Sequence, residues 1–95
     1  MTGMLRIIAY DIASNRRLRK VAMICLDYGV RIEKSVFECR IDNERLDELV
    51  RRLKEAVNRN EDHFVVYSVC QTCEDKVIDY GHAEHTDLDE TVLVL

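Results

Sequence analysis

Ile7-Ile8-Ala9-Tyr10-Asp11-Ile12 is the stretch of this sequence that decides the fold. Around it, residues 4–11 are apolar in both alternating sets and only Arg6 interrupts them, which predicts a strand that is covered on both faces. The strand carries Asp11 at its C-terminal end, just before an arginine-rich helix start. In an α/β arrangement, a metal-assisted reaction on phosphate would be placed at such a strand end.

The residues that follow predict a helix with a basic side. Ser14 has the side chain of a helix N-cap, and apolar residues recur at helical spacing as far as Tyr28. We expect Gly29 to end this helix in the left-handed conformation. Positive charge near a helix N-terminus opposes the macrodipole, so a partner anion explains the basic cluster better than helix stability does. The cluster consists of Arg16, Arg17, Arg19 and Lys20.

Residues 30–41 are rich in β-branched and aromatic side chains, with Lys34-Ser35 in the middle, so they form either one long strand or a short hairpin. Asp42 or Asn43 can cap a second helix, which has a clean apolar stripe. The stripe consists of Leu46, Leu49, Val50, Leu53 and Val57. The rest of the chain predicts strands at 64–70 and 76–80, an acidic loop at 81–90 and a terminal strand at 91–95.

This order of elements is the βαββαβ pattern of a ferredoxin-like α+β sandwich, a single domain over residues 1–95 with its core in 1–80. Two helices cover only one face of a sheet, whereas the strands at 4–11 and 64–70 are apolar on both sides. We therefore expect a symmetric homodimer to cover the open face. The strand at 91–95 fits this arrangement, because an apolar strand needs a sheet edge, including that of a partner.

Composition limits the class of protein. The 95 residues make one domain, which can bury about 60 to 65% of its unfolded surface. A content of 47% hydrophobic and 34% charged residues indicates a soluble globular chain and excludes a disordered one. No apolar run approaches the roughly 18 residues that span a bilayer, and the start lacks a signal-peptide pattern. We expect a cytoplasmic protein without a membrane segment.

The net charge of −4 argues alone against a general nucleic-acid binder, but the charge is unevenly divided. Residues 1–60 hold 13 Lys and Arg against 9 Asp and Glu, whereas residues 61–95 hold 1 against 9. A basic surface on the first part could therefore meet a polyanion while the acidic part stays away from it. Ordinary solvated charge is the alternative.

Three segments together resemble the CRISPR-associated protein 2 family, the small endonuclease-like subunit of the CRISPR spacer-acquisition machinery. They are the strand at 7–12, the basic helix start at 15–22, and residues 28–39, which include Ser35-Val36-Phe37-Glu38. The similarity continues through the second helix, the strand end at 67–73 and the terminal strand, so it covers nearly the whole chain. The Tyr-Asp-Ile strand end is specific in combination with Ser-Val-Phe-Glu.

This resemblance implies a ferredoxin-like homodimer in which Asp11 of each subunit faces its copy across the two-fold axis, and a hairpin at 30–41. Family members are described as Mg²⁺-dependent endonucleases acting on RNA or DNA, and as the scaffold on which integrase subunits insert new spacers into a CRISPR array. We therefore expect a metal-dependent endonuclease with one Mg²⁺ shared by the two Asp11 carboxylates. A hard cation relieves the repulsion between two such carboxylates.

Three alternatives stay open at this point. The chain could be a non-catalytic scaffold that holds DNA in the integrase complex, or a ribonuclease toxin on the same fold. Asp11 could also merely cap the following helix.

Other residues of the matching segments are candidates for binding or support. Tyr10 would act through a hydroxyl beside Asp11, and Ser35 belongs to the matching segment. Phe37 could stack on a base, which is worth about 1 to 3 kcal/mol, although a strand Phe more often packs in the core. For the basic candidates, phosphate contact is the functional interpretation and a solvated face the alternative. These candidates are Arg16, Arg17, Arg19, Lys20 and Arg31.

The four cysteines lack the density of a secreted disulfide scaffold, so we expect them to be reduced. Cys70 and Cys73, followed by His82 and His85, have the residue types of a zinc site, but the eight-residue gap in the middle is shorter than usual finger spacing. A redox pair is a further alternative. We interpret these cysteines as inert strand-end residues and expect no zinc.

Overall fold

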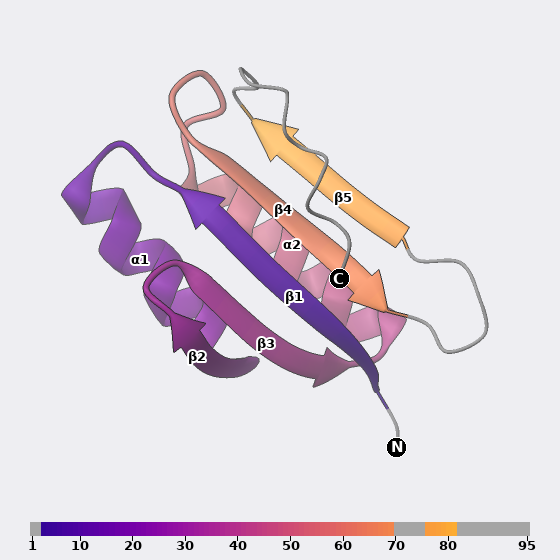
Figure 1. Cartoon of the computed structure of the whole chain (residues 1–95). Helices are drawn as coiled ribbons and strands as arrows, with labels where there is room; N and C mark the ends of the chain where they lie inside the picture. The colour runs from indigo at the N-terminus through magenta and orange to yellow at the C-terminus, as the bar shows by residue number, and fades with distance from the viewer. Residues whose placement is uncertain (1–2, 70–75, 82–95) are drawn as a thin grey trace.

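The computed structural model describes residues 3–69 and 76–81. Its strands form one sheet in the order β2-β3-β1-β4-β5, with every neighbouring pair antiparallel. Both helices lie on one face of this sheet (Figure 1). The order of the elements confirms the ferredoxin-like α+β prediction. In chain order they are β1 (Met4–Asp11), α1 (Asn15–Leu26), β2 (Gly29–Glu33), β3 (Val36–Ile41), α2 (Asn43–Ala56), β4 (His63–Val69) and β5 (Lys76–Gly81).

Residues 30–41 form a hairpin, as the family resemblance implied. β2 and β3 pair on either side of a turn at Lys34 and Ser35. The Ser35 carbonyl accepts the N–H of Tyr10 at 3.1 Å. The hairpin turn therefore lies at the end of β1 that carries Asp11. The acidic loop and terminal strand expected beyond Gly81 lie outside the described residues.

Side chains of the central strand β1 divide between two environments. Arg6, Ile8 and Tyr10 are buried on the side of the helices, whereas Ile7 and Ala9 point to the other face and are half-buried. Alternation along a strand accounts for this division. The core between sheet and helices contains, among others, Ile8, Val21, Cys25, Phe37, Leu49, Leu53, Phe64 and Val66.

Both helices begin at side chains that accept a backbone N–H. Ser14 Oγ accepts the N–H of Arg17 at 3.2 Å, which confirms Ser14 as the cap of α1. Asp42 Oδ1 accepts the N–H of Arg45 at 2.9 Å, so Asp42 is the cap of α2. Among the described residues, neither helix is long and apolar enough to cross a bilayer.

The expectation that Gly29 ends α1 in the left-handed conformation was wrong. The helix ends at Leu26, with Asp27 as a right-handed C-cap, and among the described residues only Gly81 has a positive φ. Gly29 instead begins β2 opposite Cys39. A Cβ at Gly29 would lie 2.6 Å from the Cβ of Cys39, so the close approach of the two strands requires glycine there.

Arg6, which interrupts the apolar pattern of β1, is a structural residue and is only 2% exposed. Its guanidinium donates to the Ile41 carbonyl at 3.2 and 3.0 Å, to Ser68 Oγ at 2.8 Å and to Asn43 Oδ1 at 3.2 Å. These hydrogen bonds replace the water that the buried charge has lost. Arg6 thereby joins β1 to β4 and to the start of α2.

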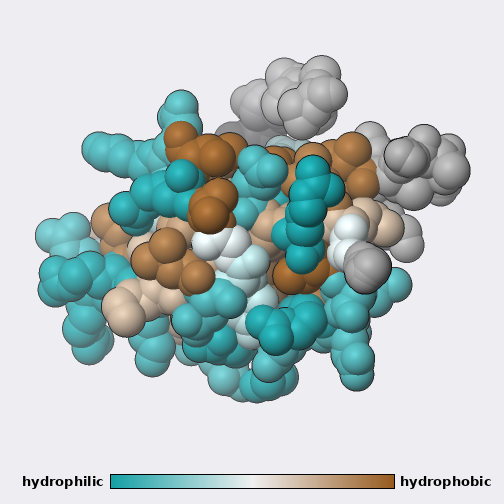
Figure 2. Space-filling model, turned by 90° about the horizontal axis from the view of Figure 1, so that it is seen from below, coloured by the Kyte–Doolittle hydropathy of each residue, from teal (hydrophilic) through white to brown (hydrophobic). Residues whose placement is uncertain are grey.

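The sheet face away from the helices is apolar along its centre and carries charged side chains nearer its margins, among them Glu38, Arg40 and Asp79, and no helix of the described part of the chain covers it. We call it the open face; it carries side chains of β1, β3, β4 and β5. Val77 is 55% exposed there and Val69 37% exposed. Figure 2, seen from below, shows hydrophobic residues interspersed with hydrophilic ones in the upper half and almost only hydrophilic residues along the lower edge. The apolar members of the open face are Leu5, Ile7, Ala9, Val36, Val65, Tyr67, Val69 and Val77.

Leu49→Ala is expected to lower the free energy of unfolding by about 2 to 5 kcal/mol, because it leaves a cavity between α2 and the sheet. Leu49 is 0% exposed. Urea unfolding followed by circular dichroism measures the change. The matched control is Leu26→Ala, at a position that is 55% exposed, for which we expect a change below about 0.5 kcal/mol. Equal losses in the two variants would contradict this description of the core.

Candidate functional site

Asp11 is the last residue of β1, and its side chain is exposed. Because side chains alternate along a strand, Asp11 lies on the open face together with Ile7 and Ala9. The cap of α1 is Ser14, so Asp11 does not cap the following helix. The Asp11 carboxylate therefore stands at the edge of an uncovered apolar surface, in a position to meet a second molecule.

Tyr10 and Phe37 lie on the opposite, helix-covered face. Their rings stack with centroids 6.1 Å apart, and Phe37 is 0% exposed. Burial raises the pKa of Tyr10, and the nearby Arg31 guanidinium partly offsets this shift. Among the described residues, the Tyr10 hydroxyl has no partner in hydrogen-bond geometry. The two rings therefore pack in the core, where Phe37 is closed to a base and the Tyr10 hydroxyl does not lie beside Asp11.

Most of the predicted basic residues are exposed. Arg16, Arg19 and Lys20 are exposed along α1, and Arg31 is exposed on the edge strand β2. The Arg31 guanidinium carbon lies 5.3 Å from the centroid of the Phe37 ring, which orients this side chain. α1 starts directly after β1, so its basic residues belong to the same end of the molecule as Asp11. These residues offer phosphate ligands at the end of the molecule that carries Asp11, on the helix side of the sheet, whereas Asp11 itself lies on the open face.

Arg17 has a different role from its neighbours. Its Nε donates to Asp62 Oδ2 at 2.7 Å, and its Nη2 donates to Asp62 Oδ1 at 3.2 Å and to Glu61 Oε1 at 2.9 Å. Asp62 is 0% exposed. The sequence predicts a partner anion for the basic helix start. For Arg17 that anion is the carboxylate of Asp62, which belongs to the same chain. We therefore revise the prediction that Arg17 contacts phosphate.

His63 is a residue that the sequence did not single out. It is the register partner of Asp11 across β1 and β4. Its Nε2 lies 2.6 Å from Asp79 Oδ1 of β5, so the imidazole is held by a carboxylate on the open face. The sequence carried no signal for this pairing, because the three residues come from three separate strands.

Within residues 3–69 and 76–81, no group of three or more His, Cys, Asp or Glu side chains could hold a metal ion. All four residues of the zinc alternative, Cys70, Cys73, His82 and His85, lie outside the described residues. Cys25 and Cys39 are buried and lie outside any disulfide in the described residues. Burial raises the pKa of Cys25 to about 12 and that of Cys39 to about 11, which disfavours the thiolate form of both near neutral pH.

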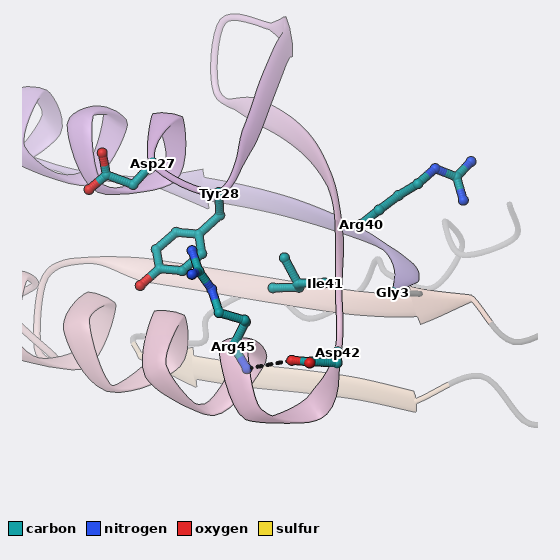
Figure 3. Close-up of a pocket in the computed structure, with 7 residues that line it drawn as sticks. All are labelled: Gly3, Asp27, Tyr28, Arg40, Ile41, Asp42 and Arg45. Carbon is teal, nitrogen blue, oxygen red and sulfur yellow. Dashed lines mark hydrogen bonds between the residues drawn. The ribbon is translucent and has the colours of Figure 1, made fainter. Parts of the chain in front are cut away.

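A hollow lies between the end of α1 and the start of α2, at the opposite end of the helix layer from Asp11, and the side chains around it contact one another (Figure 3). Arg45 lies across the ring of Tyr28, with its guanidinium carbon 4.7 Å from the ring centroid. Arg52 donates to the Tyr28 hydroxyl at 3.1 Å and pairs with Asp27 at 3.0 Å. The stick view also shows Arg40 pointing away from the hollow. None of the residues predicted to be functional lines this hollow.

Comparison with known proteins identifies several relatives that are named Cas2. The family model described as CRISPR associated protein Cas2 matches residues 4–77. The chain is 31% identical over 93 residues to CRISPR-associated endoribonuclease Cas2 1 of Moorella thermoacetica, covering 93% of this chain and 97% of that protein. It is 33% identical to CRISPR-associated endonuclease Cas2 of Halalkalibacterium halodurans, covering 95% and 99%. The crystal structure of Streptococcus pyogenes Cas2 superposes with a TM-score of 0.67 at 30% identity, covering 73% of this chain and 89% of that one.

Proposed function

This chain belongs to the Cas2 family of CRISPR-associated proteins, and from that premise we propose that it is a cytoplasmic, metal-dependent endonuclease that cleaves phosphodiester bonds in RNA or DNA. The observation that carries the proposal is the position of Asp11, exposed at the edge of the apolar open face. Relatives named endoribonuclease and endonuclease support the reaction class.

A homodimer through the open face would bring two Asp11 residues together. The face is apolar, and burying it against a copy of itself would remove its side chains from water. The family resemblance places the two-fold axis near the end of β1, and with the axis there each Asp11 would face its own copy. Two carboxylates at one place repel each other unless a cation lies between them.

The donor set of this site fits Mg²⁺ rather than a softer ion. Asp11 offers hard carboxylate oxygens from a position open to solvent. Mg²⁺ is commonly held by one or two carboxylates and keeps several waters, so one Asp11 from each subunit would suffice. When bound, such an ion lowers the pKa of a coordinated water and offsets charge on phosphate. Arg16, Arg19 and Arg31 would hold the nucleic-acid backbone through charge-assisted hydrogen bonds.

Cleavage of labelled RNA and DNA tests this function. The protein should cut in the presence of Mg²⁺ and stop when a chelator is added, and Asp11→Ala should cut at least about 10²-fold more slowly. Solution mass measured on the same samples tests the dimer in parallel.

A scaffold within the integrase complex is a second candidate, and the sparse metal site favours it. A single Asp11 per chain, with no three-residue cluster in the described residues, is a weak metal site by itself. The exposed basic residues of α1 could still hold a DNA duplex between integrase subunits. In that case Asp11→Ala would leave spacer acquisition intact, whereas removal of residues 91–95 would abolish it.

Reversing charge on α1 is expected to weaken nucleic-acid binding under both functions. The double variant Arg16→Glu/Arg19→Glu should lose at least about tenfold in affinity for duplex DNA at low salt. The slope of log affinity against log salt concentration should decrease by the amount expected for the loss of about two phosphate contacts. Fluorescence anisotropy over a salt series measures both quantities. The control, Arg45→Glu/Arg51→Glu on α2, also reverses two exposed arginines and should change affinity less than threefold. Equal losses would show that only net charge matters.

A further inference from the structure

Asp62 is the most completely satisfied buried carboxylate of the described chain, and no function assigned so far uses it. Its side chain is 0% exposed. Oδ1 accepts the Ala13 N–H at 2.8 Å, and Oδ2 accepts the Asn58 N–H at 2.8 Å. Arg17 adds hydrogen bonds to both oxygens, at 2.7 and 3.2 Å. One side chain thus joins the loop after β1, the start of α1 and the turn before β4.

These contacts connect Asp62 to the backbone on both sides of the pairing between Asp11 and His63. Ala13 follows Asp11 by two residues and is hydrogen-bonded to Asp62. Asp62 is followed at once by His63, which pairs with Asp11 across the sheet. The backbone is therefore held at Asp11 by its pairing with β4 and just after it by the hydrogen bond from Ala13 to Asp62, although Asp62 does not itself lie on the open face.

The turn that carries Asp62 is also contacted by the end of β5. Gly81 of β5 pairs with His63 and has a φ of +113°. A Cβ at Gly81 would lie 2.8 Å from the His63 Cα and would also collide with the Asp62 carbonyl oxygen. β5 thus packs directly against this backbone, and the turn has little room to move.

Electrostatics hold the carboxylate in its charged form. Burial alone would raise the pKa of Asp62, but Arg17 and the N–H groups of Asn58 and Ala13 outweigh it and lower the pKa below the usual value. The carboxylate therefore stays an acceptor for all these donors at neutral pH.

We propose that Asp62, with Arg17, is a positioning residue that fixes the Asp11 carboxylate in the geometry in which the dimer binds its divalent cation. The proposal rests on the function proposed above. It also gives Arg17 a role at the site without contact to the nucleic acid. Residues that orient a metal ligand from behind typically change metal affinity by about 10- to 100-fold when they are replaced.

The test compares Asp62→Asn, which keeps the size of the side chain, with two controls. Glu61→Gln alters the neighbouring residue, which contacts Arg17 from a side chain that is 58% exposed. Leu49→Ala destabilises the core at a residue that makes no hydrogen bond to Asp11, Asp62 or Arg17. Full-length protein is used throughout, and circular dichroism establishes that each variant is folded.

Binding of Mn²⁺, followed by the electron paramagnetic resonance signal of the free ion, is the first measurement. Asp62→Asn should raise the Kd for Mn²⁺ at least about tenfold and shift the Mg²⁺ midpoint of cleavage equally, with the rate at saturating Mg²⁺ changed less than threefold. Both controls should stay within about twofold of wild type, because neither alters Asp11 or any of the four hydrogen bonds that Asp62 accepts. A folded Asp62→Asn protein with the Kd and midpoint of wild type would overturn the proposal.

Amide signals of Asp11, Ala13 and Asn58 in a ¹H–¹⁵N NMR spectrum are the second measurement, and they do not depend on metal. Asp62→Asn should shift the Asp11 signal and speed hydrogen exchange at Ala13 and Asn58 at least about tenfold, while Glu61→Gln should not. If wild type and Asp11→Ala take up Mn²⁺ equally, the proposed endonuclease site is wrong. In that case the positioning role is tested only by the amide signal of Asp11, and an unchanged signal in Asp62→Asn overturns that role.

Discussion

Asp11→Ala is expected to lower Mg²⁺-dependent cleavage of RNA or DNA by about 10²- to 10³-fold, the loss seen when a main electrostatic group of an active site is removed. In a homodimer the substitution deletes both carboxylates of the shared site at once. Asp11→Asn should lose as much, because it keeps the shape of the side chain and removes its charge. Single-turnover cleavage over a Mg²⁺ series, with a chelator as the zero point, measures the effect.

Two controls decide whether Asp11 acts as a shared ligand. Asp47→Ala removes another exposed carboxylate, on α2, and should keep cleavage within about twofold of wild type. Heterodimers with one Asp11→Ala subunit should cleave almost as poorly as the double variant if both carboxylates hold one ion. Half the wild-type rate in heterodimers would indicate two independent sites. Wild-type cleavage by Asp11→Ala would contradict the endonuclease function and leave the scaffold.

Much of the fold could be predicted from the sequence, because residues close together in the chain determine where its strands and helices begin and end. The double-sided apolar run at 4–11 predicted the central strand, and Ser14 predicted the start of α1. The hairpin at 30–41 needed the family resemblance, since Lys34-Ser35 fits both a turn and an exposed bend in one strand. Gly29 was misread because glycine serves both left-handed caps and close strand contacts, and the sequence does not tell these uses apart.

The candidate site was predictable only in part. Asp11 was found because it ends a strand, which is a property of the sequence. The pairing of Arg17 with Asp62 was missed, because it joins the first turn of α1 to the turn before β4, and the acid looked like one more member of a polar turn. His63 was missed for the same reason, since its relation to Asp11 exists only in the register of β1 against β4. Contacts between distant segments follow from the sheet order, which the sequence does not state.

Ile7→Glu is expected to separate the proposed dimer into monomers. Ile7 lies at the centre of the open face, on the central strand and opposite Tyr67 in register. A stable dimer buries about 800 Å² of each partner, a sizeable part of the 6024 Å² that this chain exposes, so the open face would be broadly covered. A carboxylate at its centre would be buried next to its own copy, which a dimer cannot tolerate without a counter-charge.

Light scattering after size exclusion measures the change in mass. Wild type should have twice the chain mass of 11.1 kDa, and Ile7→Glu should have the chain mass itself. Leu26→Glu places the same charge on the outer side of α1, at a position that is 55% exposed, and should remain dimeric. Circular dichroism must show that Ile7→Glu is folded, because Ile7 is half-buried within one chain.

Cleavage by the monomeric variant then connects assembly to chemistry. If the metal needs one Asp11 from each subunit, Ile7→Glu should lose cleavage to the same extent as Asp11→Ala, although its own Asp11 is intact. Activity should also return as protein concentration rises, because mass action restores the pair of carboxylates. A folded monomer that cleaves at the wild-type rate at every concentration would show that Asp11 works within a single chain. The open face would then have to serve a partner other than a second copy.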